Sequence, residues 1–136
     1  MDRQTTEALI ADYYAAFNAG DAAGMEARVT DDVEHRVNEG ETRRGRAAFA
    51  EFCSHMGVSY RERLEDVTVF ATADGRRGAA EFTVHGEYLK TDPGLPEARG
   101  QTYVLPAGAF FDIADGRIAR ITTFYNLADW VRQVSA

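Results

Sequence analysis

Two side chains of this sequence combine chemical reactivity with an apolar setting. Tyr13 belongs to an apolar stripe in which Leu9, Tyr13 and Phe17 recur at every fourth residue. His35 lies between Val33 and Val37 in a segment where apolar and polar residues alternate. A phenol donates a hydrogen bond and a neutral imidazole accepts a proton. The pair therefore predicts either a pocket that holds a donor and a base, or a core in which both polar groups are satisfied locally.

Other kinds of active site have little support in the sequence. The three histidines, His35, His55 and His85, lack the spacing of zinc ligands. Cys53 is the single cysteine and has no nearby histidine and aspartate pattern that would make it a nucleophile. No glycine-rich loop of the phosphate-binding kind is present. We expect no metal and no cofactor.

The elements that must position these residues change along the chain from helical to strand-like. Helices are expected at about residues 5–19, 22–29, 46–56 and 127–134. A short strand is expected at Val33–Val37, and from about residue 60 the pattern favours strands at Val67–Ala71, Ala79–Leu89, Thr102–Phe111 and Arg117–Tyr125. The proline-containing segment 91–100 reads as an extended hairpin loop.

Local signals mark the ends of these elements. Gly20 suits a left-handed residue after the first helix, and Asp21 and Asn126 suit the caps of the second and last helices. Asp74-Gly75 and Asp115-Gly116 suit the positive φ angles of tight hairpins, so the neighbouring strands should run antiparallel. Helices followed by a bent sheet predict a single α+β domain over residues 1–136, with the helices on one sheet face.

Composition limits the partners of such a domain. The 15 Lys and Arg against 22 Asp and Glu give a formal charge of −7, which repels phosphate backbones, so we expect no nucleic acid partner. No apolar run approaches the roughly 20 residues of a membrane span, and the N-terminus shows no targeting pattern. One cysteine permits no internal disulfide. We expect a soluble, cytoplasmic protein without a membrane partner.

Several motifs resemble one known superfamily over essentially the whole length. They are Tyr13 to Asp21 with its Asn-Ala-Gly-Asp run, Asp31-Asp32, Phe82 to Tyr88, His85 to Asp92, Gly94 to Pro96, Gly100 to Tyr103, Asp115 to Ile118 and Phe124 to Leu127. These resemble the ketosteroid isomerase, nuclear transport factor two and polyketide-cyclase-like superfamily, and within it the bacterial ketosteroid-isomerase-related proteins. The resemblance implies a cystatin-like fold: three N-terminal helices in the concave face of a strongly curved, mixed, mostly antiparallel sheet, a cone with a pocket, and a short C-terminal helix.

The resemblance also implies roles for individual residues. Tyr13 matches the tyrosine that donates a hydrogen bond to the substrate oxyanion. The isomerases' base falls at or near Val37, which takes no proton, so His35 on the same strand face is the nearest substitute. Their second donor falls at Ala109. Tyr13 and His35 are therefore the expected catalytic residues, and the expected substrate-binding residues are Phe17, Val37, Phe82, Tyr88, Tyr103, Tyr125 and Trp130.

Two classes of function remain open at this stage. The first is a cofactor-independent enzyme that isomerises, cyclises or hydrates an apolar carbonyl compound, and the second is a binding protein or dimeric assembly module for a small apolar molecule. Epoxide hydrolysis ranks third because Arg36 lies on the wrong strand face to begin an Asp-Arg-Asp relay. Three short helices cover only one sheet face, so we also expect a homodimer through the other face, with His85 near the contact.

Overall fold

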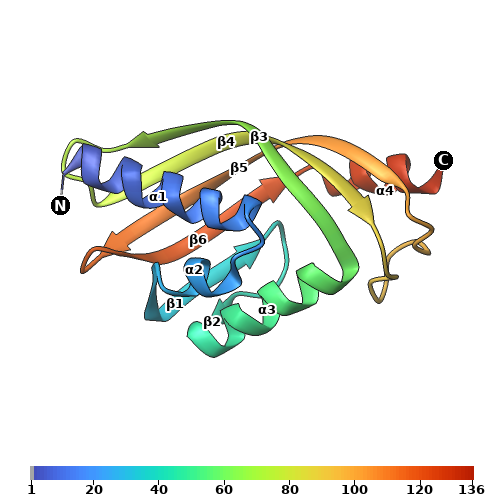
Figure 1. Cartoon of the computed structure of the whole chain (residues 1–136), viewed down its shortest axis with the longest axis horizontal. Helices are drawn as coiled ribbons and strands as arrows, with labels where there is room; N and C mark the ends of the chain where they lie inside the picture. Colours follow the sequence, from blue (N-terminus) through green and yellow to red (C-terminus); the bar gives the residue numbers. More distant parts are fainter. Residues whose placement is uncertain (1) are drawn as a thin grey trace.

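The computed structural model describes residues 2–136 and shows an α+β fold in which the N-terminal helices lie along a curved sheet (Figure 1). The elements are α1 (Arg3–Asn18), α2 (Ala22–Glu26), β1 (Val29–Val37), β2 (Arg43–Arg44), α3 (Arg46–Ser59), β3 (Tyr60–Ala71), β4 (Arg77–Tyr88), β5 (Thr102–Ala114), β6 (Arg117–Tyr125) and α4 (Leu127–Ser135). The predicted fold class is confirmed.

The sheet has six strands in the order β2-β1-β6-β5-β4-β3. Strands β3 to β6 form an antiparallel meander, as the turn signals predicted, and β1 lies parallel to β6. β1 begins at Val29, which pairs with Ile118, so the predicted helix over 22–29 ends earlier, at Glu26. Pairing with a strand far along the chain decides the fate of these residues, which a local periodicity does not report.

Strand β3 is longer than predicted because a bulge interrupts its alternation. It starts at Tyr60 rather than Val67, and its register against β4 shifts between Glu65 and Thr68, where Asp66 has φ 54°. Before the bulge, Tyr60, Glu62 and Leu64 share the concave face. The bulge changes which parity faces inward, and it bends the strand around the core.

The ends of the elements follow the predicted local chemistry with one exception. Asp21 accepts a hydrogen bond from the Gly24 amide, and Asn126 accepts one from the Asp129 amide, so both cap their helices. At the β5–β6 turn, Asp115 and Gly116 both have positive φ. Between β3 and β4 the loop is longer than a two-residue turn, and only the glycine of Asp74-Gly75 is left-handed. The Asp74 carboxylate instead accepts hydrogen bonds that close the loop.

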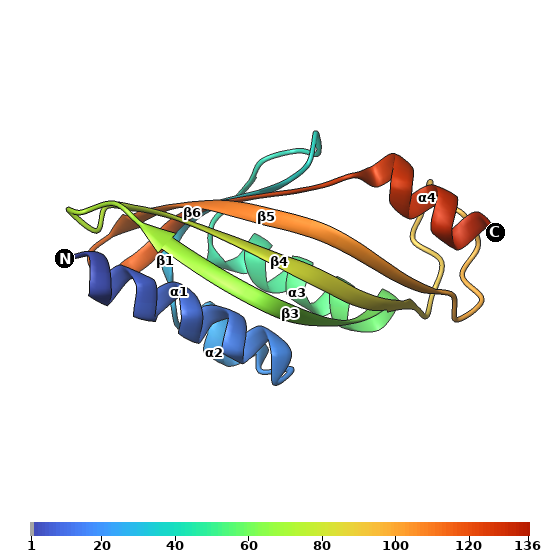
Figure 2. The same ribbon diagram turned by 90° about the horizontal axis from the view of Figure 1, so that it is seen from above.

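Helices and sheet enclose the core on the concave side. Helix α1 runs along β3 and β4, and α4 lies at the end of the sheet opposite the N-terminus (Figure 2). One set of buried rings, Tyr13, Tyr14, Phe49, Phe82 and Phe111, fills the space under α1 and α3. A second set, Tyr88, Tyr103 and Trp130, is buried near α4. The cone therefore has two aromatic ends with different neighbours.

Candidate functional site

Tyr13 projects from α1 into the first aromatic set. Its side chain is 4% exposed, and its ring packs edge-on against Tyr14 and Phe111, at centroid distances of 5.1 and 6.3 Å. Burial, followed by the proximity of Tyr14 and Cys53, raises the pKa of its hydroxyl well above the usual value. The phenol therefore stays protonated. It is a hydrogen-bond donor in an apolar environment.

His35 lies on the concave face of β1, beside Ile121 of β6. Its imidazole is 4% exposed and contacts Phe52 and Phe49 at centroid distances of 4.5 and 5.4 Å. Burial, helped by the nearby Arg43 charge, lowers the pKa of the imidazole to about 4, so the ring is neutral at pH 7. Its Nδ1 is buried and has no hydrogen-bond partner in residues 2–136. A buried polar atom without a partner costs stability unless a water molecule or a ligand pairs with it.

The Phe49 ring connects these two residues. It contacts Tyr13 at 6.4 Å and His35 at 5.4 Å between ring centroids. A neutral imidazole and a protonated phenol thus share one aromatic wall, so both face the same half of the cone. The first aromatic set therefore holds one proton acceptor and one hydrogen-bond donor, both almost fully buried.

Tyr125, one of the expected substrate-binding residues, lies away from His35 along the cone. It pairs with Ala107, whereas His35 lies level with Ile121, four residues earlier on β6. Four residues of a strand span about 13 Å. Burial, with the neighbouring Glu62 charge as the next cause, raises the pKa of Tyr125 to about 12. Tyr125 therefore belongs with Glu62.

The other predicted binding residues divide between packing and lining. Phe82 packs on Tyr14 at 5.0 Å between ring centroids, and Phe17 and Val37 are half-buried. Tyr88 is fully buried, and its hydroxyl donates to the Pro96 carbonyl at 2.6 Å and accepts from the Asp92 amide at 2.9 Å. This hydroxyl holds the loop 91–100, so its structural role is clear.

Tyr103 and Trp130 meet at the end near α4. Their ring centroids are 5.9 Å apart, and Trp130 also packs on Tyr88 at 4.9 Å. The Tyr103 hydroxyl donates a 2.5 Å hydrogen bond to Oε2 of Glu62. Gly86 on β4 lies between Glu62 and Tyr103 and is the direct strand partner of both. A Cβ on Gly86 would overlap the Tyr103 ring, so the glycine makes room for this contact.

Glu62 is the residue that sequence reasoning missed. It is half-buried, and on β3 to β6 of the described chain it is the one carboxylate whose register places it on the concave face. Burial raises its pKa, and the Tyr103 hydrogen bond partly offsets that rise. In the run Arg61 to Asp66 the charges hide the alternation. The usable signal was that Tyr60 and Leu64, two residues on either side of Glu62, are both apolar.

The concave face is not uniformly covered. Some inward-facing residues stay half-buried although Tyr103 and Leu105 beside them are buried. They are Val37, Tyr60, Glu62, Gly86, Ala107, Thr123 and Tyr125. By contrast, Ala109 and Phe111, toward the narrow end, are fully buried. Glu62 and Tyr125 therefore lie where the concave face remains accessible.

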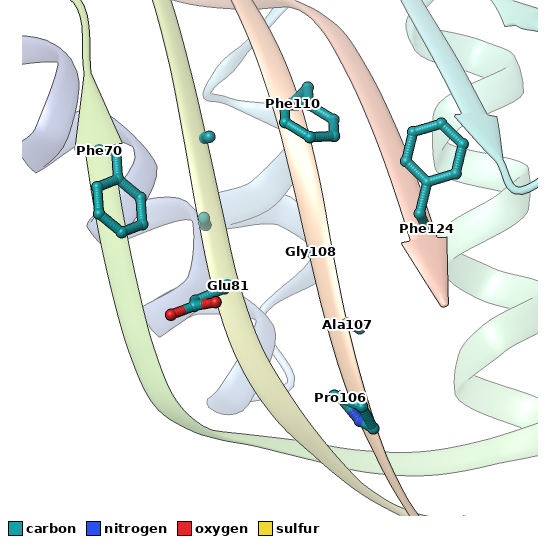
Figure 3. Close-up of a pocket in the computed structure, with 9 residues that line it drawn as sticks. Phe70, Glu81, Pro106, Ala107, Gly108, Phe110 and Phe124 are labelled. Atoms are coloured by element: carbon teal, nitrogen blue, oxygen red, sulfur yellow. The ribbon is translucent and has the colours of Figure 1, made fainter. Parts of the chain in front are cut away.

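A separate hollow of about 470 Å³ lies on the opposite face of the sheet (Figure 3). Its walls include Phe70, Phe110 and Phe124, which are 52%, 48% and 48% exposed. It contains one acidic side chain, Glu81, and no histidine. Because the sheet separates it from Tyr13 and His35, this hollow is a surface feature distinct from the candidate active site.

Neither a metal-binding cluster nor a membrane-spanning helix is seen in the described part of the chain. Within residues 2–136, no three side chains of histidine, cysteine, aspartate or glutamate come together as a metal site would require. None of the helices in that range has the length and apolar character needed to cross a membrane.

Comparison with known families supplies the identification. The family described as the SnoaL-like domain matches residues 10–121. The chain belongs to this family. No curated protein matched the chain. The match to the SnoaL-like family confirms the superfamily that the motifs predicted.

Solved structures place this SnoaL-like chain among close relatives. A "putative polyketide cyclase" from Pseudomonas putida is 58% identical, with a TM-score of 0.94 over 95% of this chain and 97% of that one. Another "putative polyketide cyclase", from Silicibacter sp., is 57% identical, with a TM-score of 0.96 over 100% of this chain and 99% of that one. An epoxide hydrolase from M. tuberculosis, described as LEH-like, has a TM-score of 0.73 at 15% identity over 98% and 91%, which shows a shared fold alone.

Proposed function

We propose that this SnoaL-like chain is a cofactor-independent enzyme that moves a proton on an apolar carbonyl compound. The observation that carries the proposal is the unpaired, buried Nδ1 of His35, which shares the Phe49 wall with the protonated hydroxyl of Tyr13. The cyclase descriptions of the 57–58% identical relatives support a carbonyl substrate.

The chemistry follows from the two protonation states. Neutral His35 takes a proton from the carbon next to a carbonyl, the C–H electron pair forms a carbon–carbon double bond, and the π pair of the carbonyl moves onto its oxygen. Tyr13 donates a hydrogen bond to that oxygen. Return of the proton to another carbon gives isomerisation, and attack of the enolate carbon on a second carbonyl gives cyclisation.

The low basicity of His35 restricts the substrate class. An imidazole with a pKa of about 4 is a weak base, so it suits a C–H bond that is already acidified. A carbon between two carbonyl groups has that property. We therefore favour 1,3-dicarbonyl compounds with an aromatic or other apolar body over simple ketones.

A binding protein is the second candidate. Ala109 and Val37 occupy the positions where the isomerases carry carboxylates, and both pair with Thr123 without adding an acid or a base. A cone without those groups would still hold a small apolar ligand. An enzyme would convert its substrate, whereas a binding protein would hold the same molecule without changing it.

The first test compares Tyr13→Phe and His35→Gln with the unaltered chain on a panel of aromatic 1,3-diketones and β,γ-unsaturated ketones. Deuterium uptake from D2O, followed by NMR, measures proton transfer. Loss of the Tyr13 hydroxyl should lower the rate by about 10²-fold, and should change the free energy of unfolding by no more than about 1–2 kcal/mol. His35→Gln should lower the rate by about 10²-fold or more.

His85→Gln is the matched control, because His85 lies on the outer sheet face and pairs with Glu65. Phenols that mimic an enolate serve as binding probes, and their affinity should also fall in Tyr13→Phe. Binding without exchange in any form would support the binding protein and contradict the enzyme. Equal phenol affinity with and without the Tyr13 hydroxyl would remove Tyr13 from the site.

We also propose that two copies pair through the outer sheet face. The exposed Phe70, Phe110 and Phe124 support this assembly. A cytosolic location is a further proposal, supported by the half-buried free thiol of Cys53.

A further inference from the structure

The Glu62 carboxyl group lacks the partners that a structural carboxylate usually has. No Lys, Arg or His side chain lies within ion-pair distance of it in residues 2–136, and its one hydrogen bond there comes from the Tyr103 hydroxyl. That bond engages Oε2 and leaves Oε1 free. Oε1 is not among the buried polar atoms without a partner, so this oxygen of a partly buried carboxyl group is open to solvent or to a bound molecule.

The surrounding residues hold Glu62 in one place. Glu62, Gly86 and Tyr103 form one row across β3, β4 and β5, and the missing side chain at Gly86 lets the Tyr103 ring lie across β4. Trp130 packs edge-on against Tyr103, which fixes that ring from the side of α4. Three strands and one helix thus orient a single carboxyl group.

The orientation is toward the accessible part of the concave face. Tyr60 and Glu62 on β3, Ala107 on β5 and Tyr125 on β6 are all half-buried, inward-facing residues of this region. The Tyr60 hydroxyl is already engaged, since it donates to Asp92 at 2.7 Å. Aromatic rings on both sides of Glu62 favour a planar, apolar molecule.

We propose that Glu62, held by Tyr103, is a proton-transfer residue of this chain that acts on planar apolar substrates in the accessible half of the cone. The inference goes beyond the proposed function, because Glu62 lies with Tyr125 and not beside His35, and it rests on that function only for the class of reaction. The substrate C–H bond breaks, the proton forms an O–H bond at Oε1, and the released electron pair moves to the acceptor atom of the substrate. Tyr103 is a positioning residue.

The electrostatic setting supports this role. Burial raises the pKa of Glu62, which makes its ionised form a stronger base than an ordinary exposed glutamate. The groups that face it are Tyr103 on β5, Tyr125 on β6, and the Tyr60–Asp92 pair of β3 and the loop 91–100. The pKa values of these tyrosines are raised, so their hydroxyls stay neutral near pH 7 and do not act as the base in place of Glu62.

A substrate-independent probe tests the assignment. 5-Nitrobenzisoxazole loses one C–H proton to a base while its N–O bond breaks, and the yellow nitrophenolate product is read by absorbance. No cofactor or second reactant is needed. The unaltered chain should convert the probe faster than the same concentration of free acetate does, and Glu62→Gln should reduce this rate by about 10²-fold.

Glu65→Gln is the matched control, since Glu65 lies on the same strand but faces outward, beside Arg63 and His85. It should convert the probe at the unaltered rate. Thermal unfolding of each variant shows whether it is folded. No conversion by the unaltered chain above acetate, or equal rates for the chain and Glu62→Gln, would overturn the assignment of Glu62.

Tyr103→Phe gives a second, independent readout. The Tyr103 hydrogen bond lowers the Glu62 pKa, so its loss should move the acidic limb of the pH–rate profile to higher pH. A profile that does not move would remove Tyr103 as the positioning residue.

The two hypotheses fail separately. Unchanged ketone exchange in Tyr13→Phe contradicts the proposed function, whereas unchanged probe conversion in Glu62→Gln contradicts the role of Glu62.

Discussion

At the scale of the residue, His35 shows how burial sets chemistry. The imidazole has aromatic rings on two sides and Arg43 nearby, and both burial and that positive charge disfavour its protonated form. Arg43 itself stacks on Phe52 at 4.7 Å from the ring centroid. A histidine that is neutral over the whole physiological range keeps one nitrogen available as an acceptor.

This environment predicts a pH dependence of stability. The pKa of His35 falls from 6.5 in the unfolded chain to about 4 in the folded chain, so between these values the unfolded state binds more protons. The free energy of unfolding is therefore unaffected by this titration above pH 6.5. As the pH falls toward 4, it decreases by up to about 3 kcal/mol. His35→Phe should flatten the pH dependence of the unfolding free energy in this window.

Urea titrations at a series of pH values measure the effect, and the difference between the two proteins cancels the titration of surface carboxylates. His55→Phe removes an exposed histidine together with its contact to Asp92, and it measures the part of the pH dependence that comes from a surface histidine. Parallel pH curves for the chain and His35→Phe would show that His35 is not neutralised by burial.

At the scale of the element, Asn18 ties the end of α1 to the edge strand β3. Its side-chain amide donates to the Leu64 carbonyl at 2.9 Å, and its amide oxygen accepts from the Leu64 N–H at 2.8 Å. The side chain thus pairs with backbone groups of Leu64 in the way that a neighbouring strand would at this edge of the sheet. It also fixes β3 next to the bulge that turns Glu62 inward, and it protects an open edge.

Loss of this clamp should destabilise the fold measurably. We expect Asn18→Ala to lower the free energy of unfolding by about 1–2 kcal/mol, because two hydrogen bonds to partly buried backbone groups are lost. Asn18→Asp keeps the acceptor and loses the donor, so its free energy of unfolding should lie between those of the unaltered chain and Asn18→Ala. Urea midpoints give the order, and an Asn18→Ala midpoint equal to that of the unaltered chain would refute the clamp.

At the scale of the whole molecule, the two sheet faces have different roles. Helices cover the concave face, whereas the outer face exposes Phe70, Phe110 and Phe124 around the hollow in Figure 3. Charges of both signs border this region, with Asp112 paired to Arg120 and Arg77, and the Arg120 bond at 2.8 Å. A face with an apolar centre and both signs of charge complements itself, as a twofold interface requires.

We therefore expect a homodimer at micromolar concentration. Phe110→Asp puts a charge at the centre of the face, next to Phe124, and should give a monomer without unfolding because Phe110 is already exposed. Sedimentation equilibrium measures the mass. Val58→Asp, at an exposed apolar position on α3, is the control and should stay dimeric. A monomeric unaltered chain would contradict the proposal.

The sequence predicted much of this fold because many of its signals are local. The stripe of Tyr13, the caps at Asp21 and Asn126 and the turn at Asp115 depend on neighbours within about four residues, and the structure confirms them. The inward direction of His35 follows from alternation on a short regular strand. These features are fixed by chain geometry over short distances.

Features that depend on distant contacts were decided by the tertiary structure. The parallel β1–β6 pairing, the start of β1 at Val29 and the bulge of β3 arise where segments far apart in the sequence meet. Glu62 is the clearest case. Its one local signal, the apolar Tyr60 and Leu64 two residues away on each side, gives at most its direction, and only the strands that bring Gly86 and Tyr103 beside it make it a partly buried carboxyl group. The sequence alone determined most of the elements and the faces of their regular parts, whereas the environment that sets a pKa is created only when those faces close around a side chain.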